Sequence, residues 1–338
     1  MTQNDVIASG VPRVPVGDWF DSLVGWMTDN LGVLFDGISS AVTFTVEHLT
    51  TWLTAPPTWV LILIFTALAL LLAGWKLGLF TLLGFGLIDN MELWQPAMDT
   101  LAMVLVAAVV AVVIALPLGV AAARSNVVSR VLRPILDLMQ TMPPFVYLIP
   151  AVFFFSIGVV PGVVATVIFA LPPGVRLTEL GIRGVDKEMV EAGHAFGTPP
   201  NRILTRIQIP LAMPSIMTGI NQLIMLSLSM VVIAGMAGAD GLGGEVLEGI
   251  NRVDIPKGFE GGVAVVVVAI FLDRLTGSFG QGGGMGLTLF QRGASNMSSG
   301  RTVDPTKLTT KPRAKTPAEV PAKTSEKASA TAAADSPR

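Results

Sequence analysis

Two long stretches of this 338-residue chain contain no charged side chain, and they constrain its fold more than any other feature. Residues 100–123 and 212–238 each exceed the ~20 apolar residues that a helix needs to cross a bilayer. The chain is 51% hydrophobic and only 14% charged, with a mean hydropathy of +0.66. We therefore expect an all-α, polytopic transmembrane helical bundle of about seven spans.

The remaining expected spans are shorter or interrupted. Residues 58–74 are just long enough to cross, whereas the apolar run at 77–88 has a length more typical of a re-entrant segment. A tight helical hairpin over 58–88 gives seven spans and an external N-terminus, and a single crossing gives six and an internal one. The later spans are expected at 135–158, broken by Pro143-Pro144, at 162–180 and at 261–279.

The two ends of the chain differ from this transmembrane domain, which we place at 58–280 with its core at about 95–280. Residues 1–57 are acidic, and Trp19, Leu23 and Trp26 share one helical face, which predicts an external amphipathic segment. Residues 281–338 lack apolar periodicity, so we expect a disordered cytoplasmic tail.

A polar island at 187–210 separates two apolar runs, and its pattern predicts two short helices. We expect Thr198 to cap the second helix, Pro199 to open it and Pro210 to end it. Gly193 and Gly197 form a small-xxx-small pair that another surface could approach closely. Taken alone, these residues fit an ordinary cytoplasmic connection as well as they fit a docking loop.

The island reads Glu191-Ala192-Gly193, three residues, Gly197, nine residues, and then Ile207-Gln-Ile-Pro210. This pattern resembles the EAA loop of ABC-importer permeases, with a glycine and an isoleucine as mild departures from Glu-Ala-Ala and Ile-x-Leu-Pro. Three further segments resemble the glycine betaine/proline-type permease subfamily, namely residues 140–147, 226–232 and 272–276.

The resemblance implies a fold like that of type I ABC-importer permeases and a subunit that couples to a separate ABC ATPase through residues 187–210. It also implies an external substrate-binding protein, a permease homodimer and a compatible solute of the glycine betaine, proline or choline class. ATP and Mg would bind on the partner ATPase, and this chain would be a non-catalytic translocation subunit. The implied coupling residues are Glu191, Ala192, Gly193, Gly197, Ile207 and Pro210.

Several functions are disfavoured by what the sequence lacks. There is no cysteine, and His48 and His194 lack the spacing of metal ligands, so we expect no metal site. No Gly-x-x-x-x-Gly-Lys-Ser/Thr loop is present, and we expect no cofactor in this chain. The formal net charge of −2 gives no indication of nucleic acid as a partner, and we expect none. We expect no catalytic residue.

Polar residues at membrane depth are the candidates for the translocation path. Gln140, Thr141 and Tyr147 lie beside the Pro143-Pro144 break, and Asn221 lies in the span after the polar island. Hydrogen bonding between helices remains an alternative role for all four.

Charge predicts the orientation in the cell membrane. Basic residues cluster in two loops, near 124–133 and 183–206, which we therefore place in the cytoplasm. The C-terminus falls on the same side and the N-terminus outside. Arg176 and Glu179, three residues apart near the end of a span, can pair with each other.

Two alternative functions belong to other classes. A secondary transporter or channel would need no ATP, but the expected path offers no acid or base for a proton or sodium relay, and no inverted repeat is obvious. A membrane scaffold without transport is the third possibility, and only the long tail favours it.

Overall fold

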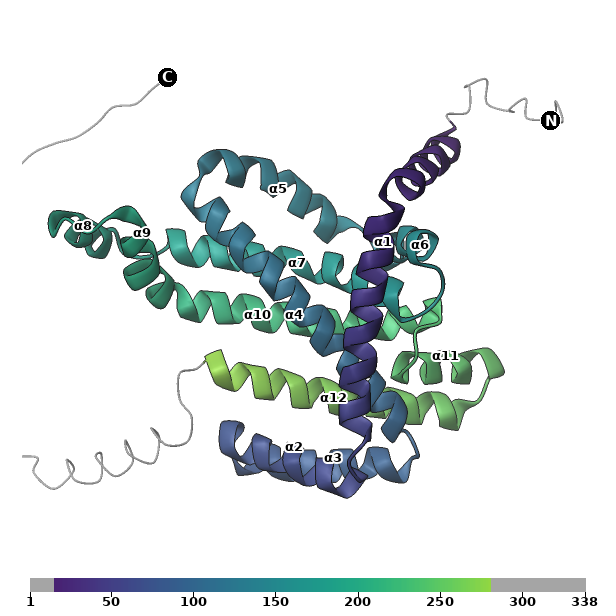
Figure 1. Ribbon diagram of the computed structural model, residues 1–338. Helices are drawn as coiled ribbons and strands as arrows, with labels where there is room; N and C mark the ends of the chain where they lie inside the picture. Colours follow the sequence, from purple (N-terminus) through teal and green to yellow (C-terminus); the bar gives the residue numbers. More distant parts are fainter. Residues whose placement is uncertain (1–14, 281–338) are drawn as a thin grey trace, which may run out of the picture. The chain divides into compact units, whose positions relative to one another are not determined.

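A computed structural model describes residues 15–280 (Figure 1). Every described element is helical, which confirms the all-α expectation for this part of the chain. The expectation of a disordered tail falls on residues 281–338 and lies outside the described residues.

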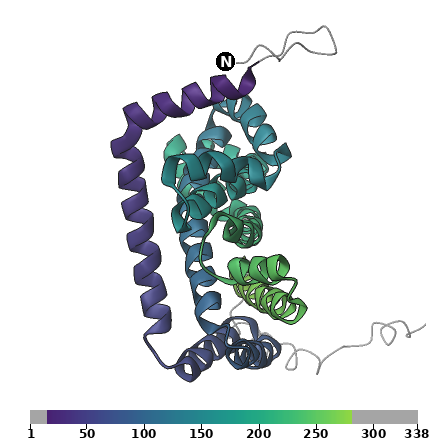
Figure 2. The ribbon, with the colours of Figure 1, turned by 90° about the vertical axis from the view of Figure 1, so that its right-hand side faces the viewer.

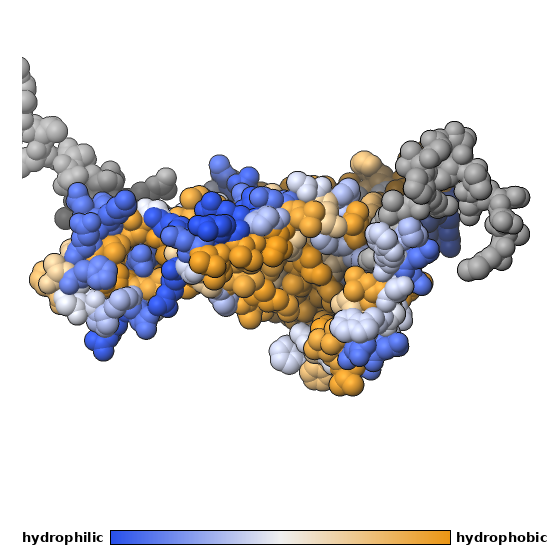
Figure 3. Space-filling view, turned by 90° about the horizontal axis from the view of Figure 1, so that it is seen from above, coloured by the Kyte–Doolittle hydropathy of each residue, from blue (hydrophilic) through white to orange (hydrophobic). Residues whose placement is uncertain are grey.

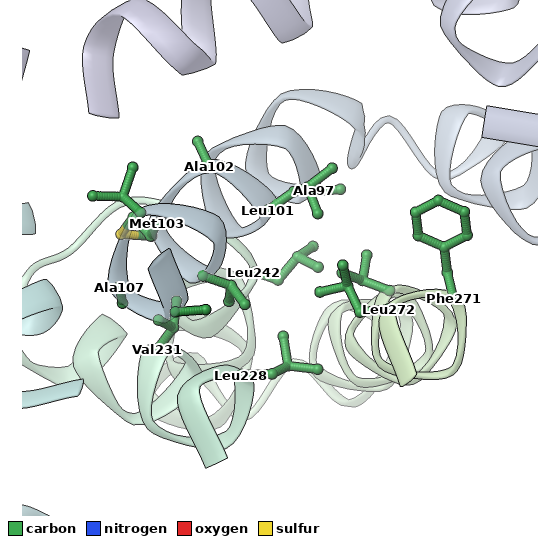
Figure 4. Packing of buried hydrophobic residues seen from close by; sticks show 14 of the residues in the cluster. Ala97, Leu101, Ala102, Met103, Ala107, Leu228, Val231, Leu242, Phe271 and Leu272 are labelled. Atoms are coloured by element: carbon green, nitrogen blue, oxygen red, sulfur yellow. The ribbon is translucent and has the colours of Figure 1, made fainter. Parts of the chain in front are cut away.

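Four described helices are long and apolar enough to cross a membrane: α4 (Trp94–Arg124), α7 (Val159–Arg183), the α10 region (Pro200–Ala237, with α10 itself Ile209–Ala234) and α12 (Ile255–Gly280). α7 packs against both α4 and α10. In Figure 4, Met103 and Ala107 of α4 face Val231 of α10 and Leu242, while Leu228 and Leu272 join α10 to α12. These residues form part of the main core.

Small residues on α7 allow its neighbours to approach closely. A Cβ on Gly174 would lie 2.9 Å from that of Ala115 in α4, and one on Gly181 would lie 2.7 Å from that of Ser215 in α10. Close backbone approach of this kind is a usual basis of helix association in membranes, where burial of apolar surface supplies little driving force.

We therefore expect Gly181→Ala to destabilise the protein by about 1–3 kcal/mol, because the added methyl group also lies 3.2 Å from the Ala212 carbonyl oxygen and α10 must move. Gly86→Ala is the matched control, since a Cβ there meets no atom within 4 Å; it should be neutral or stabilise by about 0.4–1 kcal/mol. The thermal midpoints of the purified variants in detergent test this. Equal midpoints would contradict the packing argument.

Residues 58–90 form a tight hairpin of α2 (Thr58–Ala73) and α3 (Trp75–Asn90). Gly74 supplies the turn with φ +95°, a value that favours glycine. Phe65 of α2 and Phe85 of α3 pack on Phe271 of α12, with ring centroids 5.5 and 5.1 Å apart. The chain thus forms the helical hairpin that was expected over 58–88. Each arm is about 24 Å long, shorter than an average hydrocarbon core.

The break expected at Pro143-Pro144 is present, but it is a sharp bend rather than an interruption of one span over 135–158. The chain forms α5 (Asn126–Thr141) and α6 (Pro144–Phe155), which meet at 98°. α5 begins well before residue 135 because the Ser125 side chain accepts a hydrogen bond from the Val128 N–H. Met142, which precedes a proline, then leaves the helical region, as residues before proline tend to do.

Residues 16–54 form one long helix, α1 (Val16–Thr54), that runs across the bundle helices rather than along them (Figures 1 and 2). Phe35 stacks on Phe154 of α6 at 4.7 Å and Val46 is buried, whereas Trp19 and Trp26 are more than half exposed. The helix therefore packs on the bundle through Phe35 and Val46, whereas the face of Trp19, Leu23 and Trp26 that the periodicity indicated does not pack on it. Figure 3 shows a broad apolar band between ends richer in hydrophilic side chains.

Candidate functional site

The polar island lies at one end of the bundle, opposite α11 (Leu242–Arg252) (Figure 1). It contains α8 (Lys187–Ala195), α9 (Pro200–Ile203) and a π-helical segment, Leu204–Gln208, that leads into α10. α8 begins where it does because the Asp186 carboxylate accepts a hydrogen bond from the Glu188 N–H at 3.0 Å.

Two of the predicted coupling residues hold the island together. Gly193 is buried, and a Cβ there would lie 3.0 Å from Ile207 Cδ1 and 3.3 Å from Ile203 Cγ1. The close approach at Gly193 is therefore made by the chain's own second segment. The expectation that Gly193 and Gly197 together offer a face to another surface is wrong for Gly193.

The ends of the second segment also differ from expectation. Pro199, not Thr198, occupies the cap position, and its carbonyl accepts hydrogen bonds from the Arg202 and Ile203 N–H groups of α9. Pro210 does not end the helix but lies in the first turn of α10. The π-helical turn before it shifts the hydrogen bonding by one residue, so that the Ile209 N–H reaches the Leu204 carbonyl. This irregularity lets the helix continue past a proline that lacks an N–H.

The outward surface of the island combines acid and apolar side chains. Glu191 and Ala192 are exposed, Met189 is 49% exposed, and Phe196 is 89% exposed. Gly197 has φ +70°, and a Cβ there would meet no atom within 4 Å. An aromatic ring this exposed on a polar loop, beside other uncovered apolar groups, is typical of an interaction surface.

One side-chain hydrogen bond attaches the island to α4, and a second joins α4 to α7 beside it. Arg124, at the end of α4, donates to Asn201 Oδ1 of α9 at 2.7 Å. Arg183, at the end of α7, donates to the Ala122 carbonyl of α4 at 2.7 Å. An open cleft of about 570 Å³ is lined by both arginines together with Glu191. Arg124 therefore links the island directly to α4, and Arg183 links α4 to α7.

The expected Arg176–Glu179 pair does not form. Arg176 pairs instead with Asp137 of α5. The Glu179 carboxylate lies 3.0 Å from Arg183 Nε, one helical turn further along α7. Sequence spacing identifies only neighbours on the same helix, and here Asp137 of α5 provides Arg176 with a partner on another helix.

The four residues proposed for the translocation path are not brought together. Gln140 and Thr141 are exposed at the end of α5, and the buried Tyr147 donates its hydroxyl hydrogen to the Met139 carbonyl. Asn221 instead lines a cavity of about 740 Å³ between the hairpin tip and the end of α12. Its Oδ1 atom is buried without a hydrogen-bond partner among the described residues.

That cavity is a feature that sequence reasoning missed. Lys76, Asp273 and Arg274 line it together with Asn221. One sequence signal for this cavity was present, since Asp273 and Arg274 interrupt an apolar run. Nothing in the sequence, however, predicts that this pair lies near Lys76 at the hairpin tip.

Ion pairs between α11 and α12 hold the opposite end of the bundle. Lys257 Nζ lies 2.7 Å from a carboxylate oxygen of Glu248 and 3.0 Å from one of Glu245. The hydrogen bond from Lys257 holds the pKa of Glu248 below its ordinary value of 4.5, and the charge of Arg252 adds to this effect. Because the pKa is lowered in the folded protein, the stabilisation is present above pH 4.5 and is lost as the pH falls through the lowered pKa.

Metal ligation has no support in the described part of the chain. No group of three or more His, Cys, Asp or Glu side chains that could hold an ion lies together within residues 15–280.

The fold and the island together define a class: a helical membrane protein with an exposed polar loop at one end of its bundle. Comparison with known proteins is specific. Residues 115–282 match the family of binding-protein-dependent transport system inner membrane components. The chain is 49% identical over 266 residues to the glycine betaine transport system permease protein OpuAB of Bacillus subtilis, covering 79% of this chain and 94% of that one.

A second relative is the glycine betaine/proline betaine transport system permease protein ProW of Escherichia coli. It is 44% identical over 268 residues, covering 79% of this chain and 76% of that one. Among solved structures, an inward-facing conformation of the MetNI methionine ABC transporter aligns with a TM-score of 0.52 and 22% identity, over 57% of this chain and 97% of that one. This last likeness shows the fold alone.

The chain belongs to the family of binding-protein-dependent transport system inner membrane components. It is a non-catalytic permease subunit of an ABC importer, located in the inner membrane, and the resemblance found in its sequence is confirmed. Membership implies an ATPase and a substrate-binding protein as partners.

Proposed function

We propose that this permease imports a compatible solute of the glycine betaine class, driven by an ATPase that docks on residues 187–210. The solute class rests on relatives that share 44–49% of their aligned residues with this chain and are named for glycine betaine. The docking site rests on Phe196, Met189 and Ala192 beside Glu191, since these apolar groups stay exposed to solvent within residues 15–280.

Uptake by cells that carry the complete transport system, with and without this chain, tests the solute class. We expect loss of glycine betaine uptake without the chain, with proline and choline as competing solutes to define the range. Unchanged glycine betaine uptake, with loss of uptake of an unrelated solute, would overturn the assignment.

We also propose that ATP and Mg bind on the partner ATPase, and that two copies of this chain form the translocation path. A path between copies fits the arrangement of the polar candidates. Gln140 and Thr141 lie at the surface of one copy, and Asn221 lines a separate cavity of the bundle. In a symmetric pair of chains, Gln140, Thr141 and Asn221 would each occur twice around the shared two-fold axis.

The proposed orientation places the island in the cytoplasm and α1 outside, with both hairpin arms crossing. The island end carries Arg124, Arg183 and Lys187, as cytoplasmic loops do, and the α11 end carries Glu245 and Glu248.

A reporter fused after Asp36 or Gly249 should therefore read as external, and one fused after Lys187 as cytoplasmic. Activity of a periplasmic reporter and fluorescence of a cytoplasmic one measure this. If Asp36 reads as cytoplasmic while the other two hold, the hairpin does not cross twice and the count of seven spans is wrong.

A further inference from the structure

Glu179 of α7 is a buried acid whose partners include residues of a different helix. It is 7% exposed, and its carboxylate accepts a hydrogen bond from the buried Ser129 hydroxyl of α5 at 2.6 Å. Arg183 Nε lies 3.0 Å and Arg133 Nη2 3.7 Å from the same carboxylate oxygen. Because a buried carboxylate that loses its partners is strongly destabilised, these contacts hold α5 against α7.

Arg183 extends this connection toward the island. Its remaining N–H groups donate to the Ala122 carbonyl of α4 and to Asn126 of α5. Two residues beyond Ala122, Arg124 donates to Asn201 of α9. A series of polar contacts therefore runs from the island, through the end of α4, to Glu179 and α5.

α5 attaches to the main core through one short apolar row, the buried Leu136 and the half-buried Leu132 and Met139. Only Ser129 and Leu136 are buried along it, while Val127, Val131 and Leu138 are each more than half exposed. A second tie to α7 is again ionic, between Arg176 and Asp137. α5 then leads into the 98° bend before α6. Polar ties of this kind can be remade in a second arrangement, whereas an interlocked core cannot easily slide.

We propose that Glu179 is a positioning residue that transmits movement of the island to α5 and, through the bend, to α6. The inference rests on the proposed docking of an ATPase on the island. Without Glu179, the ATPase would still dock and hydrolyse ATP, but α5 would no longer follow.

The test uses the complete transporter with a fluorescent label on Leu138→Cys, an exposed α5 position in a chain that has no other cysteine. The permease is labelled before assembly with its ATPase. In the parent, we expect ATP to change the label signal. In Glu179→Gln, we expect co-purification of the ATPase and ATP hydrolysis to persist, the label response to disappear, and solute transported per ATP to fall by about tenfold.

Glu260→Gln is the matched control, because it removes the same charge from an exposed position on α12 and should behave as the parent does. If Glu179→Gln does not accumulate, Ser129→Ala decides by the same readouts, since it removes only the hydrogen bond between the helices. The proposal would be overturned if these variants showed the same ATP-induced change of label signal and the same solute transported per ATP as the parent. It would also be overturned if ATP did not change the label signal in the parent. Failure of the parent to retain the ATPase would instead contradict the docking site.

Discussion

Gly197→Asp is expected to abolish solute uptake while the permease is inserted at normal abundance. Gly197 has φ +70°, a region that aspartate and asparagine tolerate better than most residues, and a Cβ there meets no atom of this chain within 4 Å. The new carboxylate would therefore project from the island into the interface proposed with the ATPase, where an unpaired charge is costly. Membrane abundance, ATPase co-purification and uptake are measured in the same preparation.

Gly197→Asn separates the effect of charge from that of backbone strain, because asparagine has nearly the same size and conformational preference as aspartate. We expect it to retain more uptake than Gly197→Asp. Normal uptake in Gly197→Asp would mean that this part of the island is only a connection between spans.

Phe196→Ser should weaken ATPase docking by about 2 kcal/mol or more, which is the scale of an aromatic hot spot in an interface. The ring is 89% exposed in the permease alone, so its removal should leave the stability of the bundle unchanged. Titration of the purified permease with its ATPase gives the change in affinity.

Phe259→Ala provides the control, since it removes a ring that is 72% exposed near the start of α12, at the end of the bundle opposite the island. It should not alter ATPase affinity. Equal affinities for Phe196→Ser and the parent would exclude this face of the island as the docking surface.

The class of fold and the place of the island could be predicted from the sequence. The charge-free runs at 100–123 and 212–238 correspond to α4 and α10, because length without charge leaves a chain few other stable arrangements. The motif from Glu191 to Pro210 placed the island directly before the second of these runs, and its two short helices are present.

The wrong predictions rested on short-range sequence rules, which do not include contacts with distant parts of the chain or irregular helical turns. Pro210 was expected to stop a helix, but the π-helical turn before it accommodates the missing N–H. Arg176 and Glu179 have pairing spacing, yet Asp137 and Ser129 of α5 offer partners that no spacing rule includes. The size of the bend after α5 could not be predicted from the sequence either, because an apolar run interrupted by prolines has the same pattern as one kinked span.

The most direct test of the account is uptake of glycine betaine by vesicles that contain this permease, its ATPase and its binding protein. The account predicts accumulation that requires both ATP on the ATPase side and the binding protein on the opposite side, and that Gly197→Asp eliminates. Accumulation without ATP, or without the ATPase subunit, would contradict it and favour a secondary transporter or channel.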